Sequence, residues 1–111
     1  MDAHPANIEL ELVRLSAQAE PLVAKLARQS REAAEAEAEY RIAYATAFLK
    51  ADGTVAMREQ IATLAAGDHL LRRKIAEAQA DATKEAGRML RAQLDALRSI
   101  NANARQAAGL S

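Results

Sequence analysis

Apolar residues recur through the first part of the chain at alternating intervals of four and three positions. The series runs through Ile8, Leu12, Leu15, Ala19, Leu22 and Leu26. This spacing keeps side chains on one side of an α-helix and is typical of a coiled-coil seam. It predicts a helix over about 6–20 and a second over 22–51. Pro21 should kink the chain near Ala19 and Glu20, because proline lacks a backbone donor.

A second stripe, made largely of alanine, leads up to a turn. Its members are Ala27, Ala34, Ala38, Ile42, Ala45 and Leu49. Asp52 and Gly53 come next, and glycine readily takes the positive φ that ends a helix. Thr54 can cap the helix that follows, because its hydroxyl accepts a hydrogen bond from the backbone. The chain is therefore expected to fold back at Gly53.

The third stripe begins after this turn and again advances by four and three residues. It comprises Met57, Ile61, Leu64, Asp68, Leu71, Ile75, Ala78 and Ala82, and after a phase shift over 85–89 it resumes with Leu90, Leu94, Leu97, Asn101 and Ala104. This pattern predicts one long helix over 54–103. The alternative is a bend at Gly67, with Asp68 capping a new helix instead of occupying the seam.

Together the stripes predict an all-α protein in which residues 1–111 form a single helical domain. The expected fold is a long antiparallel helical hairpin, similar to a coiled coil, with a proline-kinked N-terminal segment. Good helix formers dominate the composition, as they do in long helices. A partner or oligomer seam is expected at Ile8, Leu12, Leu15, Leu90, Leu94 and Leu97. Residues 8–15 carry more large apolar side chains than one narrow stripe uses, which favours a homo-oligomeric bundle.

All three aromatic residues of the chain precede the turn. Tyr40, Tyr44 and Phe48 are four apart and so form one ridge on a helix. We interpret this ridge, with Gly53 at the turn and Met57 and Ile61 as packing partners, as the bulky closed end of an alanine-rich hairpin. The alternative is an exposed ridge that docks a partner.

Charge does not point to a polyanion or a membrane as the partner. The 15 basic and 15 acidic side chains cancel, although residues 1–51 carry a small acidic excess and 52–111 a small basic one. The basic residues that could form a nucleic-acid face are Arg72, Arg73, Lys74, Lys84, Arg88 and Arg91. Acidic residues are interleaved with them, which favours an ordinary solvated helix face.

No motif for catalysis or for binding a cofactor is visible. The chain has no cysteine, and its histidines, His4 and His69, do not stand at the spacing of helical metal ligands. No apolar run is long enough to span a bilayer, and the first residues do not resemble a secretory signal. We expect a cytoplasmic, non-enzymatic protein with no cofactor, no metal and no small-molecule substrate.

The block YRIAYATAFLKADGTVAMR, Tyr40 to Arg58, resembles a pattern in small helical proteins of phage and prophage genomes. The ending LRAQLDALRSINANAR, Leu90 to Arg105, is similar to theirs as well. The resemblance implies an accessory protein encoded by a phage, and it brings no catalytic residues. The expected function is binding or scaffolding of another protein. The alternative is an accessory nucleic-acid-binding protein in phage replication or recombination.

Overall fold

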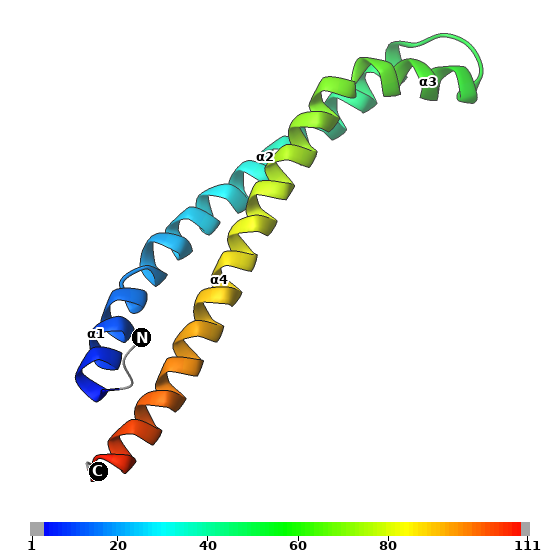
Figure 1. The fold of residues 1–111 in the computed structure, drawn as a ribbon. Helices are drawn as coiled ribbons and strands as arrows, with labels where there is room; N and C mark the ends of the chain where they lie inside the picture. Colours follow the sequence, from blue (N-terminus) through cyan, green and yellow to red (C-terminus); the bar gives the residue numbers. More distant parts are fainter. Residues whose placement is uncertain (1–3, 110–111) are drawn as a thin grey trace. The chain divides into compact units, whose positions relative to one another are not determined.

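The part of the chain that the computed structural model describes, residues 4–109, is almost entirely helical (Figure 1). Its helices are α1 (Pro5–Ser16), α2 (Ala19–Lys50), α3 (Val55–Ala65) and α4 (Gly67–Ala107). The predicted all-α fold and the helical hairpin are confirmed. The structure divides into two compact units where the sequence predicts one domain. Unit 1 comprises Met1–Lys25 with Thr83–Ser111, and unit 2 comprises Leu26–Ala82.

The break between α1 and α2 lies in unit 1, slightly ahead of the predicted kink. Helix α1 ends at Ser16, residues 17–18 form a turn, and Pro21 falls in the first turn of α2. A proline is tolerated there because backbone N–H groups in the first turn have no partner within the helix. The N-terminus of α1 is capped by His4, whose Nδ1 accepts a hydrogen bond from the Ala6 N–H at 3.2 Å.

Unit 1 is held together by large aliphatic side chains from three helices. Ile8 and Leu15 of α1 pack with Leu90, Leu94 and Leu97 of α4, and Leu12, Ala19, Leu22 and Ala104 lie against this cluster. All six residues predicted as a seam are thus brought together within one chain. We assign them to internal packing, because side chains buried in this way are not available to a partner. Arg105 Nη1 also donates to Glu9 Oε1 at 2.6 Å, which links α4 to α1.

Unit 2 has a different interior, built from small and polar residues. Helix α2 contributes no buried residue, and the buried apolar residues of unit 2 are Ala62, Ala66 and Ala80. The half-buried residues between these helices include Ala33, Ala36, Tyr40, Ala43 and Ala47 from α2, and His69, Arg73 and Ala76 from α4. Alanine lets helices approach closely but removes little apolar area from water. The interior of unit 2 therefore contributes less to stability than that of unit 1.

This interior corrects the predicted phase of both stripes in unit 2. The prediction placed Ile42 and Leu49 of α2, and Met57, Ile61, Leu64, Leu71 and Ile75 after the turn, in the hairpin seam. All of these side chains are exposed. The four-and-three spacing instead continues from Leu26 through Gln29, Ala33, Ala36, Tyr40, Ala43 and Ala47, and through Ala62, Ala66, His69, Arg73, Ala76 and Ala80. The second series reaches Leu90 with intervals of three and four residues throughout, so the phase shift predicted over 85–89 is absent.

The region predicted as a single helix over 54–103 is two helices that meet at Ala66. The φ and ψ angles of Ala66 are −95° and 5°, outside the helical range. Backbone hydrogen bonds still join Ala66 to Ala62 and Leu70 to Ala66, each at 2.9 Å, so the interruption is confined to this one residue. Asp68 lies exposed in the first turn of α4, and the half-buried position belongs to His69.

Candidate protein-interaction surface

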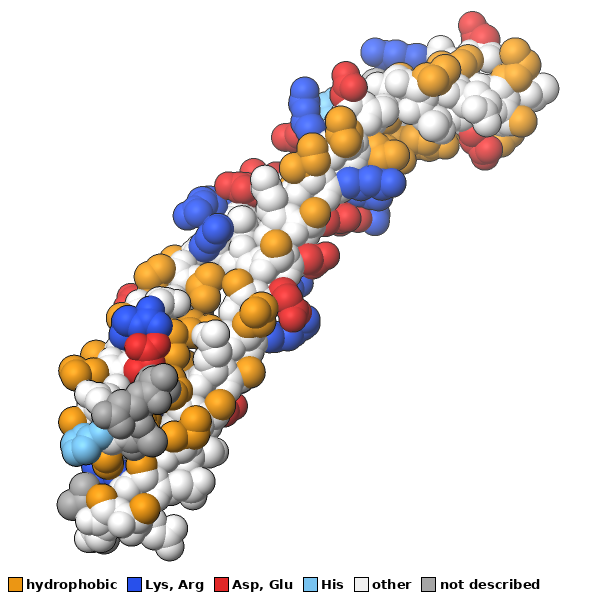
Figure 2. All heavy atoms as spheres, viewed as in Figure 1, with side chains coloured by type: hydrophobic (Ala, Val, Ile, Leu, Met, Phe, Trp, Pro, Cys, Tyr) orange, Lys and Arg blue, Asp and Glu red, His pale blue; other side chains and the backbone are white. Residues whose placement is uncertain are grey.

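Large aliphatic side chains are exposed on the outer faces of the helices of unit 2. We call this set the outer stripe, and it consists of Ile42, Leu49, Met57, Ile61, Leu64, Leu71 and Ile75. Its members on α2 and those on α4 point away from each other, because each stands about 200° from the inner residues of its own helix. Their exposed fractions range from 43% for Ile61 to 82% for Leu64. Figure 2 shows hydrophobic side chains gathered on the surface around α3. Single exposed leucines are ordinary on protein surfaces, whereas a series of exposed large aliphatic side chains makes the outer faces of these helices a candidate interaction surface.

Helical geometry explains why the outer stripe faces away from the interior. Each residue advances by about 100° around an α-helix. Leu71 and Ile75 stand two positions before and after Arg73, so each is about 200° away from that inner residue. The same offset separates Ile42 from the inner residue Tyr40. Consequently, when alanines and Arg73 occupy the interior, the large aliphatic residues must lie outside.

The turn between α2 and α3 positions the closed end of unit 2. Gly53 has φ of 110°, a conformation that glycine adopts without strain. Thr54 caps α3, since its Oγ1 accepts a hydrogen bond from the Met57 N–H at 3.2 Å. A Cβ placed on Gly53 would lie 3.3 Å from Sδ of Met57, so Met57 packs over the turn.

Arginines cover the aromatic ridge, whereas the predicted packing partners Met57 and Ile61 are exposed. The rings of Tyr40 and Tyr44 lie 6.2 Å apart, and those of Tyr44 and Phe48 6.4 Å apart. Arg58 lies 4.4 Å above the Phe48 ring, and its Nε donates to the Phe48 carbonyl at 3.1 Å. Arg73 lies 4.8 Å from the Tyr40 ring. These cation–π contacts leave the ridge half-buried. Arg58 stands four residues before Ala62, which in turn stands four residues before Ala66. The spacing of the inner positions therefore predicts that Arg58 faces the interior of unit 2.

Two polar atoms in the interior of unit 2 lack hydrogen bonds. His69 Nδ1 and Arg73 Nε are both buried without a hydrogen-bond partner. Arg73 Nε does lie 3.5 Å from Glu77 Oε1, which is an ion-pair distance with poor hydrogen-bond geometry. A buried polar atom without a hydrogen bond lowers stability. The interior of unit 2 is therefore weak in both its apolar and its polar contacts.

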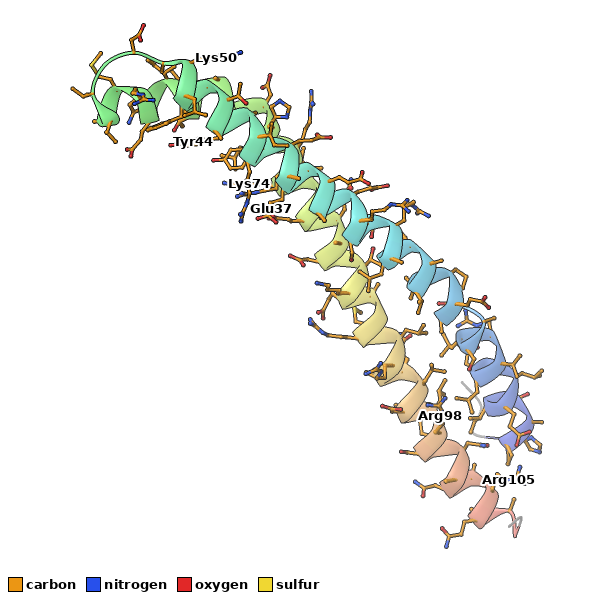
Figure 3. All side chains as sticks on the ribbon, turned by 180° about the vertical axis from the view of Figure 1, so that it is seen from behind. Glu37, Tyr44, Lys50, Lys74, Arg98 and Arg105 are labelled. Carbon is orange, nitrogen blue, oxygen red and sulfur yellow. The ribbon has the colours of Figure 1, made fainter. Side chains whose placement is uncertain are left out.

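The six basic residues proposed as a nucleic-acid face are divided between the two units. Arg72, Arg73 and Lys74 belong to unit 2, and Lys84, Arg88 and Arg91 to unit 1. Arg73 makes a cation–π contact with Tyr40 and an ion pair with Glu77. Arg88 Nη1 donates a hydrogen bond to Glu85 Oε2 at 3.0 Å. Arg72 and Lys74 are exposed. In Figure 3, Lys74 projects from the same side of unit 2 as Glu37 and Tyr44.

One carboxyl group has a shifted pKa. Glu11 accepts hydrogen bonds from the guanidinium group of Arg14 one turn later in α1, with Arg14 Nε at 2.9 Å from Oε2. These hydrogen bonds hold the pKa of Glu11 below its ordinary value and raise that of Arg14. Both side chains are solvated on the surface of unit 1, so the pair is a local helix contact and not a reactive site.

Other kinds of site were sought within residues 4–109. There, no three acidic or histidine side chains come together in a group that could hold a metal ion. None of the helices in this range is both long and apolar enough to cross a membrane. No family model matches the chain, and comparison with curated proteins and with solved structures finds no match. The outer stripe is the candidate site with the strongest physical support.

Proposed function

We propose that this protein is a non-enzymatic interaction or scaffolding protein that binds a protein chain through the outer stripe of unit 2. A single observation carries the proposal: most large aliphatic residues of unit 2 are exposed, and its buried apolar residues are alanines. Large apolar side chains contribute most when they are removed from water. Their arrangement favours a function in which another helix or sheet covers them.

Burial of the outer stripe would supply part of the free energy of association. Complete burial of one exposed Leu, Ile or Met side chain is worth about 1.5–3 kcal/mol. Because the seven residues are already partly covered, we count roughly half of this value for each, which gives about 5–10 kcal/mol in total. Association itself costs roughly 4–15 kcal/mol in lost freedom of motion. The stripe therefore suits a partner that adds polar contacts at its edges.

Site-specific photo-crosslinking tests the proposal. Benzoylphenylalanine would replace Leu71 in the outer stripe and, as a matched control, Val13, which is an exposed aliphatic residue of α1 in unit 1. After irradiation in host cells, we expect a covalent adduct with a protein chain from position 71 and little or none from position 13. Equal labelling from both positions, or none from position 71, would contradict the proposal.

A nucleic-acid-binding function is the second candidate, and the exposure of Arg72 and Lys74 favours it. Contacts with phosphates would make the affinity fall steeply with salt. Fluorescence anisotropy of labelled single- and double-stranded DNA at two salt concentrations tests this function directly. Binding at low salt that is lost in Arg72→Glu would support it, and no binding at low salt would exclude it.

The biological setting is a further part of the proposal. The resemblance of Tyr40 to Arg58 and of Leu90 to Arg105 to small phage and prophage proteins favours an accessory role in a phage-infected or lysogenic host. The cytoplasm of that host is the compartment we propose. Adducts formed in such cells would identify the process through the partner.

A further inference from the structure

We propose that the outer face of α3 and α4 in unit 2 binds an amphipathic helix with acidic edges, supplied by a different protein. This inference rests on the proposed function and names the chemistry of the partner. Four features of this face support it: one continuous row of aliphatic side chains, basic residues on both edges of the row, an acidic residue within it, and a modest apolar area.

The exposed aliphatic side chains of α3 and α4 lie on one face, unlike the outer stripe as a whole. We call them the α3–α4 row, and they are Met57, Ile61, Leu64, Leu71 and Ile75. Successive members are four, three, seven and four residues apart, which places all five within about 80° around a helix. The interruption at Ala66 preserves this alignment, because hydrogen bonds between residues four apart continue on both sides of it, from Ala66 to Ala62 and from Leu70 to Ala66.

A second helix is the element that fits this row. The helix rises by about 1.5 Å per residue from Met57 to Ile75, so the row is roughly 27 Å long. Intervals of four and three residues are those of the core positions of a coiled coil, where side chains interlock with a facing helix of the same spacing. A partner helix of about five turns would therefore cover the whole row.

Basic residues of α4 stand on both edges of the row. Arg72 directly follows one member of the row and Lys74 directly precedes another, and both are exposed. No ion pair or side-chain hydrogen bond within residues 4–109 uses either of them. Glu37 projects from the same side as Lys74 (Figure 3), but its carboxylate is paired with Arg41 at 3.0 Å. Acidic residues on the edges of a partner helix would complement these two cations.

The same charges argue against a second copy of this protein as the partner. If two copies met through the α3–α4 row, Arg72 and Lys74 of one copy would face the same basic residues of the other, whether the helices ran parallel or antiparallel. Like charges across an interface weaken it and exclude wrong partners. The row therefore suits a chain of opposite charge.

The apolar area of the row indicates a reversible contact. Burial of one fully exposed aliphatic side chain corresponds to roughly 60–120 Å² of apolar surface. The five side chains are 43–82% exposed, so the row supplies about 150–300 Å². A stable dimer buries about 800 Å² per partner, whereas a single helix that binds and dissociates needs less. Charged contacts along the edges then contribute a substantial share of the affinity and of the specificity.

Asp68 specifies one further feature of the partner. It stands within the row, between Leu64 and Leu71, and is exposed in the first turn of α4. An apolar residue opposite Asp68 would remove its carboxylate from water without a partner, which is costly. A lysine or arginine at that position would form an ion pair, and a single polar contact in such a row fixes the register of two helices. The expected partner therefore carries one basic residue within its own apolar row.

The first test is a titration of the isotope-labelled, full-length chain with a designed peptide, followed by NMR chemical shifts. The peptide, which we call the acidic probe, has about three heptads with leucine in its apolar row, glutamate on both edges and one lysine in the middle of the row. Repulsion between the glutamates keeps the probe from pairing with itself. We expect a Kd of roughly 10–500 μM, which rises with salt, and shifted amide signals centred on residues 57–75.

Matched controls test the apolar part of the contact. Leu71→Asp should weaken binding of the acidic probe at least about tenfold, because it places a charge in the row. Val13→Asp makes the same change at an exposed aliphatic residue of unit 1 and should leave binding unaltered. A probe with glutamine in place of its leucines keeps the edge charges and should not bind. If this glutamine probe bound as tightly as the acidic probe, the contact would be electrostatic only and the inference would be wrong.

A charge exchange tests the edges. The double variant Arg72→Glu with Lys74→Glu should bind the acidic probe at least about tenfold more weakly than the wild type does. It should instead bind a basic probe, in which lysine replaces every edge glutamate. A variant that had lost its fold would not gain affinity for the basic probe. Equal binding of the acidic and basic probes by the wild type would overturn the inference.

These outcomes separate failure of this inference from failure of the proposed function. Absence of binding at about 1 mM acidic probe, or shifted signals centred outside α3 and α4, would overturn the inference. In that case, a crosslink from position 71 to a protein chain would still support the proposed function. Absence of both probe binding and a crosslink from position 71 would overturn both.

Discussion

Truncation of Ile8 tests the core of unit 1. Ile8 is fully buried and is the largest side chain with that degree of burial among residues 4–109. It packs in a cluster with Leu15, Leu90, Leu94 and Leu97. The change Ile8→Ala removes three carbon atoms from this cluster while leaving the backbone of α1 able to remain helical. The matched control is Leu10→Ala, two residues away on the same helix, where the side chain is 69% exposed.

The expected loss follows from the contacts of Ile8. Three methyl or methylene groups at about 0.8 kcal/mol each give about 2.4 kcal/mol of lost burial. The cavity adds to this loss, and substitutions of this type cost 2–5 kcal/mol in other cores. Alanine has a higher helix propensity than isoleucine and offsets a few tenths of a kcal/mol. We therefore expect Ile8→Ala to lower the free energy of unfolding by about 2–4 kcal/mol, and Leu10→Ala to change it by less than about 0.5 kcal/mol.

Urea unfolding followed by far-UV circular dichroism measures both values. The protein concentration must be the same for all variants, because the apparent stability of a protein that self-associates depends on its concentration. At roughly 4 °C per kcal/mol, thermal unfolding of Ile8→Ala should occur about 8–16 °C lower than for the wild type. If Ile8→Ala and Leu10→Ala cost the same, the packing of α1 against α4 described above is incorrect.

Two further predictions concern glycine and histidine, and the same urea titration measures both. Gly53→Ala should cost about 1–2 kcal/mol because of the positive φ, whereas Gly87→Ala should add up to about 1 kcal/mol, since it lies in a helix with no atom within 4 Å of the new Cβ. If Gly53→Ala and Gly87→Ala changed the free energy of unfolding equally, an alanine side chain would not strain the backbone at Gly53. His69→Leu should stabilise the protein by about 1–2 kcal/mol, because Nδ1 is buried without a hydrogen bond. A loss of stability would mean that His69 makes a contact that leucine cannot replace.

The helices and the hairpin were predictable because their signals are local. Gly53 and Thr54 stand where a helix must end and another must begin, and both act as expected. In unit 1, α4 carries three leucines in one phase, Leu90, Leu94 and Leu97, whereas Met89 and Ile100 stand singly in other phases. One phase of the helix is therefore clearly more apolar than the others, and the structure buries that phase.

The candidate surface was predictable in its residues but not in its location. Leu71 and Ile75 were recognised as members of an apolar stripe and then assigned to the interior. Periodicity shows that side chains share a face, but it does not show which element covers that face. The cation–π contacts of Arg58 and Arg73 were not foreseen for the same reason. Basic residues are ordinarily assigned to solvent, and only the position of the neighbouring helix places these two over aromatic rings.

The sequence by itself determined that this chain forms long helices, turns at Gly53 and packs its N-terminal leucines against those near its C-terminus. Only the tertiary structure decided which face of each helix in unit 2 is inside. Two apolar phases compete there, one rich in alanine and one carrying Ile42, Leu71 and Ile75. The alanine phase lies inside because small side chains let two helices approach closely along their length. The larger side chains consequently remain on the surface, where a second chain can cover them.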